Sequence, residues 1–113
     1  MLKYKVVKIH EGATALANGT TVETMSPSDG AYNNLTIQIT GITTATVTFE
    51  GTIDGTNWVA VRATNTYDGV SSVQVSADGI YRIAFLTGVP KIRARISAYT
   101  AGTIYAVGVL TEN

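Results

Sequence analysis

The stretch VTFEGTIDGTNWVAVR, residues 47–62, decides the fold class of this chain. Val47 and Phe49 alternate with polar residues, which is the period-two pattern of a strand with one buried face. The dipeptide Asp54-Gly55 suits a turn that needs a positive φ angle. The stretch therefore predicts a β-hairpin whose return strand occupies residues 57–62.

The same alternation recurs along the rest of the chain, and no segment carries the apolar repeat of a long helix. We expect eight or nine strands in an all-β fold, a single antiparallel β-sandwich that is jelly-roll-like and covers residues 1–113. Residues 1–10 are expected to be an N-terminal arm or an edge strand. The clearest runs place on one face Leu35, Ile37 and Ile39, then Tyr81, Ile83 and Phe85, then Ile92, Ala94, Ile96 and Ala98; a further run is 103–110, and weaker runs are Leu2–Ile9, Thr20–Met25 and Val70–Val75.

The composition excludes several classes of protein. Eight basic and eight acidic residues give a formal net charge of zero, so bulk attraction to nucleic acid or to an anionic membrane is not expected. The chain has no cysteine, which excludes disulfides and thiolate metal sites. Charged residues make up 14% of the chain, against about 25% in an average soluble domain. The surface is therefore either rich in Thr, Ser and Asn or covered by a partner.

No catalytic, metal or cofactor site is predicted. His10 is the only histidine, so a histidine cluster for zinc is excluded, and we expect this residue to be solvated or at an interface. No nucleophile motif occurs. Asp54, Asp68 and Asp78 each precede glycine, which marks them as turn residues rather than paired catalytic acids. The chain is predicted not to be an enzyme.

Two sets of basic residues are the candidate partner interface. Lys91, Arg93 and Arg95 project from one face of one predicted strand and form a row roughly 14 Å long. This row is either a solvated face that pairs with acids such as Glu50, or a contact with an acidic partner. Lys3 and Lys5 form the second set, in the first predicted strand.

Trp58, the only tryptophan, has two interpretations. It can fold back over the hairpin at Asp54 and Gly55 and close one end of the sandwich as a core or semi-core residue, and truncating a buried tryptophan costs about 3–5 kcal/mol. Alternatively, it can be a stacking platform for a sugar. The first interpretation is favoured because a sugar site usually needs several aromatic residues with polar partners.

Three segments together resemble a group of small phage and prophage virion proteins. In that group, a hairpin of the form F-E-x-S/T-x-D-G-x-x-W is followed by a G-x-Y-R strand and by a strand reading aromatic-R-A-R-I-S-x-Y-x-x-G. Ile92 stands where the group often has the aromatic residue. The resemblance covers the chain from about Gly12 onward. The matching residues are Phe49, Glu50, Thr52, Asp54, Gly55 and Trp58, then Gly79, Tyr81 and Arg82, then Arg93, Ala94, Arg95, Ile96, Ser97, Tyr99 and Gly102.

The resemblance implies a β-sandwich without catalytic activity that acts as a homo-oligomer, often a trimer. We expect a phage virion structural protein, made in the host cytoplasm, that serves as a capsid (head) decoration or head-fibre protein. Its expected partners are other copies of itself and the major capsid protein or another virion protein, with no nucleic acid, membrane or cofactor. The alternatives are a tail or baseplate-associated module, and a carbohydrate-binding module that stacks a sugar on Trp58, Tyr67 and Tyr99.

Overall fold

The computed structural model describes residues 3–84, 86 and 88–112 of the chain. These residues fold into antiparallel β-strands joined by turns and loops, which confirms the all-β prediction. The predicted strand positions Leu2 and Phe85 lie outside the described residues. The strands are β1 (Tyr4–Ala13), β2 (Val22–Glu23), β3 (Met25–Ser26), β4 (Gly30–Ala31), β5 (Asn34–Thr52), β6 (Val59–Ala60), β7 (Ala63–Asn65), β8 (Ser71–Ser72), β9 (Gln74–Val75), β10 (Gly79–Ala84) and β11 (Lys91–Thr111).

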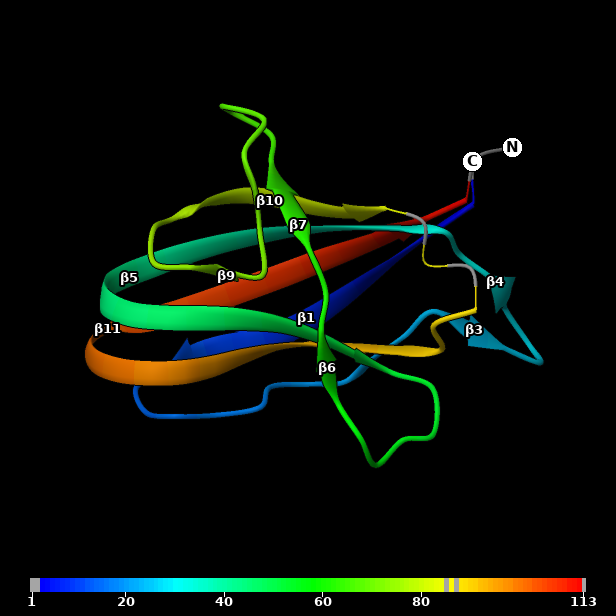
Figure 1. The fold of residues 1–113 in the computed structure, drawn as a ribbon, viewed down its shortest axis with the longest axis horizontal. Helices are drawn as coiled ribbons and strands as arrows, with labels where there is room; N and C mark the ends of the chain where they lie inside the picture. Colours follow the sequence, from blue (N-terminus) through cyan, green and yellow to red (C-terminus); the bar gives the residue numbers. More distant parts are fainter. Residues whose placement is uncertain (1–2, 85, 87, 113) are drawn as a thin grey trace.

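Two long strands, β5 and β11, form the frame of the fold. They pair antiparallel along their whole length, and both turn back at one edge so that each runs through two layers (Figure 1). The register of the pairing shifts four times between Ile96 and Tyr105, where the ladder bends. The alternating pattern predicts four separate strands here, whereas the structure joins them in pairs across the bend.

Gly41 and Gly102 lie at this bend because neither position has room for a side chain. Gly41 has a φ angle of +85°, and a Cβ atom there would lie 1.8 Å from the carbonyl oxygen of Thr103. Gly102 has a φ angle of +127°, and its Cβ would lie 2.5 Å from the carbonyl oxygen of Gly41. Such backbone conformations favour glycine. The carboxylate of Asp78 also holds the bend, since it accepts hydrogen bonds from the N–H groups of Gly41 (3.2 Å) and Ile42 (2.9 Å).

The bend divides the sheet into the two layers of a sandwich. The first layer has the strand order β1-β11-β5-β10-β7-β8, so β1 occupies an edge. In the second layer, β2 pairs with the start of β11, while β6 and β9 pair with the end of β5. The antiparallel β-sandwich predicted from the sequence is confirmed, and its jelly-roll-like connectivity stays a prediction.

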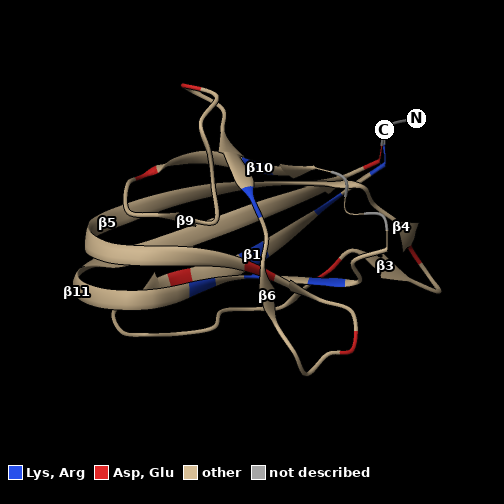
Figure 2. Cartoon of the chain, viewed as in Figure 1, with Lys and Arg blue, Asp and Glu red and all other residues tan. Residues whose placement is uncertain are grey.

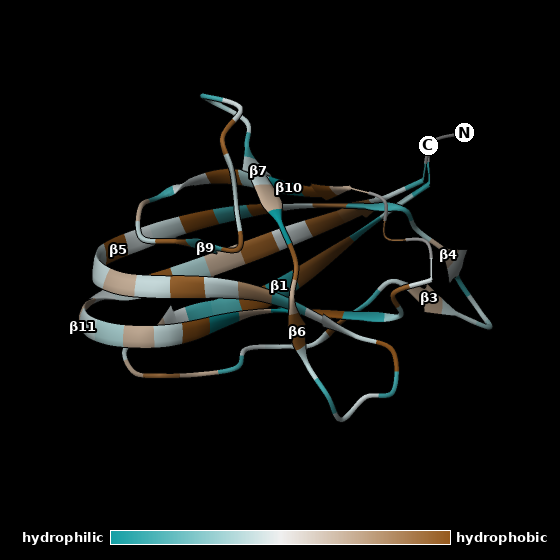
Figure 3. Ribbon diagram, viewed as in Figure 1, coloured by the Kyte–Doolittle hydropathy of each residue, from teal (hydrophilic) through white to brown (hydrophobic). Residues whose placement is uncertain are grey.

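The core lies between the layers. Leu35, Ile37 and Ile39 of the first layer are fully buried, as is Phe49 of the second layer. The ring of Phe49 lies 5.8 Å from that of Tyr81, measured between centroids, which links β5 to β10. Figure 3 shows hydrophobic and polar segments alternating along β5 and β11. Burial of each large apolar side chain contributes about 1.5–3 kcal/mol, and these residues hold the layers together.

The alternation along β11 ends earlier than the sequence predicts. Ile92, Ala94 and Ile96 are buried, as expected, but Ala98 is exposed. The reason is the register shift between Ile96 and Ala98, which turns the following residue away from the core.

Candidate functional site

The basic ladder, which we define as Lys91, Arg93 and Arg95, lies on the outer face of the second layer. Its side chains alternate along β11 with the buried residues Ile92 and Ala94. Figure 2 shows the basic segments following one another along this strand. The sequence correctly places the three residues on one face, because the register of β11 is regular up to Ile96.

Glu50 of β5 lies between the two arginines of the ladder. Its carboxylate accepts hydrogen bonds from Arg93 Nε at 2.8 Å, Arg95 Nε at 3.1 Å and Arg95 Nη2 at 3.2 Å. The hydrogen bonds from Arg95 are the main cause that lowers the pKa of Glu50, and Arg93 adds to the effect while burial opposes it. The same contact raises the pKa of Arg95. The pairing with Glu50 that the sequence suggests is therefore present, with one carboxylate between two guanidinium groups.

Trp58 packs on this row from the side of Arg93. The guanidinium carbon of Arg93 lies 4.2 Å from the centroid of the indole ring, which is a cation–π contact. Trp58 is half-buried, and its ring lies on the outer face of the second layer rather than between the layers. The physical reason is register: Ala60 of β6 faces Glu50, so Trp58, two residues earlier, lies on the outer face with Glu50 and Arg93.

The turn at Asp54 and Gly55 is built as the sequence predicts, although β6 pairs with β5 through only two residues. Gly55 has a φ angle of +80°. One Asp54 oxygen accepts hydrogen bonds from the N–H groups of Thr56 and Asn57, both at 2.8 Å, and the other accepts from the Asn57 amide at 2.7 Å. The backbone bonds from Asn57 and Thr56 are the main causes that hold the pKa of Asp54 far below its usual range. The carboxylate is thus used to shape the loop.

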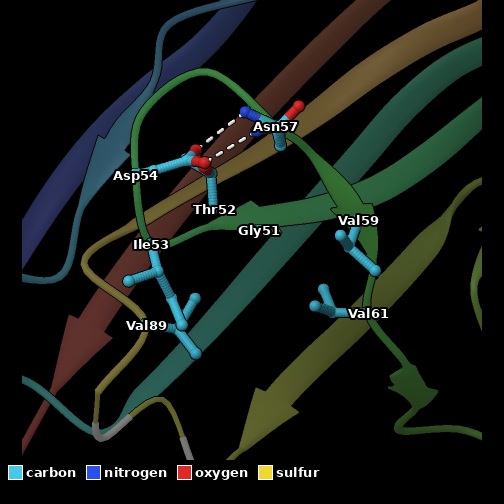
Figure 4. A pocket seen from close by; sticks show the side chains of 8 residues that line it. All are labelled: Gly51, Thr52, Ile53, Asp54, Asn57, Val59, Val61 and Val89. Carbon is cyan, nitrogen blue, oxygen red and sulfur yellow. Dashed lines mark hydrogen bonds between the residues drawn. The ribbon is translucent and has the colours of Figure 1, made fainter.

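An apolar cleft of about 430 Å³ opens beside this loop, and sequence analysis missed it. Figure 4 shows side chains from Ile53, Val59, Val61 and Val89 around the cleft, with Asp54 bonded to Asn57 at its rim. The only sequence feature that pointed to this cleft was the apolar alternation in residues 57–62. Val89 comes from a distant segment, so no local pattern could complete the cleft.

Lys3 and Lys5 do not join the basic ladder. Lys5 Nζ lies 3.0 Å from the Asp29 carboxylate, which raises the pKa of Lys5. Lys3 Nζ lies 4.3 Å from the centroid of the Tyr32 ring and 3.7 Å from the Glu112 carboxylate. Both lysines thus make contacts within the chain, at and beside the β3–β4 hairpin.

His10 is buried, so the expectation of a solvated or interface residue is wrong. Only 5% of its surface is exposed, and Nε2 donates a hydrogen bond to the carbonyl oxygen of Ala94 at 2.7 Å. The reason is close packing, because a Cβ atom on Gly19 would lie 2.6 Å from the imidazole ring. Within residues 3–84, 86 and 88–112, no three His, Cys, Asp or Glu side chains gather as a metal site would require.

The match to a family model decides the relationship of this chain to known proteins. The model of the XepA family matches residues 3–110. The chain belongs to the XepA family. A comparison with curated protein sequences gives no match.

Two solved structures share this XepA-family fold. The SPBc2 prophage-derived protein YomS has a TM-score of 0.84 at 19% identity, over 99% of this chain and 96% of that chain. The PBSX exported protein XepA has a TM-score of 0.87 at 18% identity, over 98% of this chain but only 38% of that chain. At such low identity the likeness establishes the fold alone.

The XepA-family fold also leaves an apolar surface on the outer face of the first layer. Val6, Val107 and Ile80 come from three strands of this layer, and all three are exposed. Val107 and Ile80 lie opposite Gln38 on its two sides, whereas Val6 lies opposite Val109, and Lys8 is the β1 residue opposite Val107. Tyr4 and Tyr105 are exposed on the same two strands, β1 and β11. We call these five residues the apolar face.

As to membranes, the described part of the chain has no helix of the length and hydropathy that spanning a membrane would need.

Proposed function

We propose that this protein is a non-enzymatic structural component of a phage virion that assembles as a homo-oligomer, with a trimer favoured. In this proposal it is a head decoration or head-fibre protein that binds the capsid lattice, and it is made in the host cytoplasm before it joins the particle. Membership of the XepA family supports a phage origin, as do two fold neighbours whose names describe a prophage-derived protein and a PBSX protein.

The observation that supports the proposed homo-oligomer is the apolar face. Val107 and Ile80 expose apolar surface on either side of Gln38, and Val6 exposes apolar surface opposite Val109, on a sheet face that has no covering layer among the described residues. Exposed apolar patches on small soluble domains commonly mark interfaces, and a closed symmetric assembly buries the same patch on every copy. Several weak contacts per oligomer then add up through effective concentration when the oligomer meets a repeating lattice.

Light scattering behind size exclusion tests the assembly. The protein is expected to elute as a stable trimer, and Val107→Glu is expected to convert it to a monomer because a charge would be buried at the interface. Val59→Glu is the matched control, since Val59 is also exposed but lies at the loop end of the second layer. A monomer at all concentrations, or equal effects of the two variants, would contradict the assembly.

Attachment to the particle is tested on virions purified from the strain that encodes the chain. An antibody against this protein should label intact heads in the electron microscope. Label confined to tails or baseplates would instead support the tail-associated alternative. Particles without label would overturn the virion assignment.

The carbohydrate-binding alternative lacks a common platform. Trp58 precedes β6, where one ring face is covered by Arg93. Tyr67 is 95% exposed, in the loop between β7 and β8 that projects from the opposite side of the fold (Figure 1). The hydroxyl of Tyr99 donates a hydrogen bond to the Gly102 carbonyl at the bend of β11. These three residues are on separate elements, so no observation favours this function over the first.

A further inference from the structure

The guanidinium groups of the basic ladder are fixed in place by Glu50. The side chain of Glu50 is only 12% exposed, and its carboxylate accepts hydrogen bonds from Nε of both Arg93 and Arg95. Arg93 is held from a second side by the ring of Trp58. A guanidinium held in this way loses less conformational freedom when it binds a further acceptor.

Both arginines keep donors that no described residue uses. An arginine side chain has five N–H donors. Arg95 spends Nε and Nη2 on Glu50, and Arg93 spends Nε alone, so the other terminal donors are free of acceptors in the described part of the chain. The three cations of the ladder face Glu50 and, across from Lys91 on β2, Glu23. Three positive charges against two negative charges leave the surface with one excess positive charge.

A second cleft, of about 230 Å³, opens at the Arg95 end of the ladder. One wall is the loop of residues 16–18, which is pinned to β11 by a hydrogen bond of 2.8 Å from Ile96 N–H to the Ala17 carbonyl oxygen. The side chain of Asn18 lines the cleft and has no hydrogen-bond partner among the described residues. Leu16 adds an exposed aliphatic wall.

These groups match one kind of ligand. A guanidinium edge and a carboxamide donor suit a carboxylate, because the planar fork of arginine binds the two oxygens of a carboxylate side by side. The aliphatic wall of Leu16 suits the methylene groups of a glutamate side chain and offers nothing to an inorganic anion. The Ser97 hydroxyl at the cleft is already bonded to Thr48 Oγ1 at 2.7 Å.

We propose that the cleft formed by Leu16, Asn18 and Arg95 is a docking site for a glutamate side chain on an acidic segment of a partner protein. Arg93, stacked on Trp58, supplies a second cationic contact for the next acidic residue of that segment. The inference rests on the proposed function in one respect, which is that the partner is another protein of the particle. The chemistry of the cleft does not depend on the oligomeric state.

The test is a titration of the isotopically labelled full chain with a short oligoglutamate peptide blocked at both ends. The side-chain Nε–H signal of Arg95 and the amide signal of Asn18 should shift in nuclear magnetic resonance spectra, and Trp58 fluorescence should change. Arg95→Gln is expected to weaken binding about tenfold, the effect of losing one charge-assisted contact. Arg82→Gln is the matched control, because Arg82 is an exposed arginine on β10 with no ion pair among the described residues, and it should leave binding nearly unchanged.

Asn18 provides variants that keep the ladder intact. Asn18→Ala should weaken the binding of the peptide several-fold, whereas Asn18→Asp should abolish it, since the new carboxylate would take the terminal donors of Arg95 that Glu50 leaves free. Position 18 is exposed, so both variants are expected to fold. Inorganic phosphate should compete poorly.

Several outcomes would overturn the proposal. These are the absence of any shift with the peptide, equal weakening by Arg95→Gln and Arg82→Gln, or competition by phosphate as strong as that by the peptide. The result also separates the two proposals. If the protein is a trimer on the particle but does not bind the peptide, only the proposed docking site is refuted. If it is a monomer that binds the peptide, only the proposed oligomer is refuted.

Discussion

The bend of the two long strands gives the sharpest test of the structure, through the substitution Gly41→Ala. Gly41 is exposed, and solvent exposure alone would suggest that alanine is harmless there. The structure says otherwise, because the new Cβ would lie 1.8 Å from the carbonyl oxygen of Thr103, and backbone cannot rotate away as a side chain can. Even a contact of 3.0 Å, which real Cβ atoms essentially never undercut, would need β5 and β11 to separate by more than 1 Å.

The magnitude follows from two contributions. Holding alanine at a positive φ angle costs roughly 1–2 kcal/mol. Forcing the strands apart adds about 3 kcal/mol more, since it strains ladder hydrogen bonds and loosens the packed core beneath them. The total of about 4–5 kcal/mol is exceptional for one substitution and comparable to the whole stability of many domains. It corresponds to a fall in Tm of about 15–20 °C at this chain length.

Gly69→Ala separates the two contributions. Gly69 has a φ angle of +75°, close to that of Gly41, but a Cβ atom there would meet nothing within 4 Å. This control should therefore lose only about 1–2 kcal/mol. Urea denaturation followed by Trp58 fluorescence measures both variants. Equal losses for Gly41→Ala and Gly69→Ala would refute the close approach at the bend.

Three other predictions concern the site and the core. Glu50→Gln should cost about 1–2 kcal/mol at neutral pH, given that Arg95 is 33% exposed and partly screened. Because the pKa of Glu50 is lowered in the fold, this stabilisation is present above the usual pKa of a glutamate and is lost as the pH falls through the folded-state pKa. The free energies of unfolding of the wild type and Glu50→Gln should therefore converge in acid. A difference between them in urea denaturation that stays constant from neutral to acidic pH would contradict the ion pair. Asp54→Ala should release the N–H groups of Thr56 and Asn57, which hydrogen exchange would report as faster exchange at those two residues with the core amides unchanged. Phe49→Ala should lower the free energy of unfolding by about 3–5 kcal/mol, measured by thermal denaturation, whereas Trp58→Ala should lower it clearly less, because Trp58 packs on the surface. Similar losses of stability for the two variants would contradict this surface position of Trp58.

Only part of the candidate site could be predicted from the sequence. The placement of Lys91, Arg93 and Arg95 on one face follows from the period of a β-strand, and Glu50 could be named as an acid within reach. The contact of Trp58 with Arg93 could not, since it depends on how many residues β6 pairs with β5. The cleft at Arg95 could not either, because its other wall is the loop of residues 16–18 from the far end of the chain.

The sequence by itself determined the local conformations of this protein. Alternation in residues 34–40 and 91–96 reflects strands with one buried face, and Asp54-Gly55 marks a turn whose glycine has φ +80°. These signals are local, because strand period and turn geometry are set by a few neighbouring residues.

Only the tertiary structure decided the bend, the burial of His10 and the pairing of Glu50 with two arginines. Gly41 meets Thr103 at the bend, His10 bonds to the carbonyl of Ala94, and Glu50 lies 43 residues from Arg93 in the sequence. Each contact joins residues that are far apart along the chain, and it exists only after the strands that carry them, β1, β5 and β11, have come together. A shift of one residue in the register of β5 and β11 would place Glu50 and the two arginines on opposite faces, which is why no local pattern could predict their pairing.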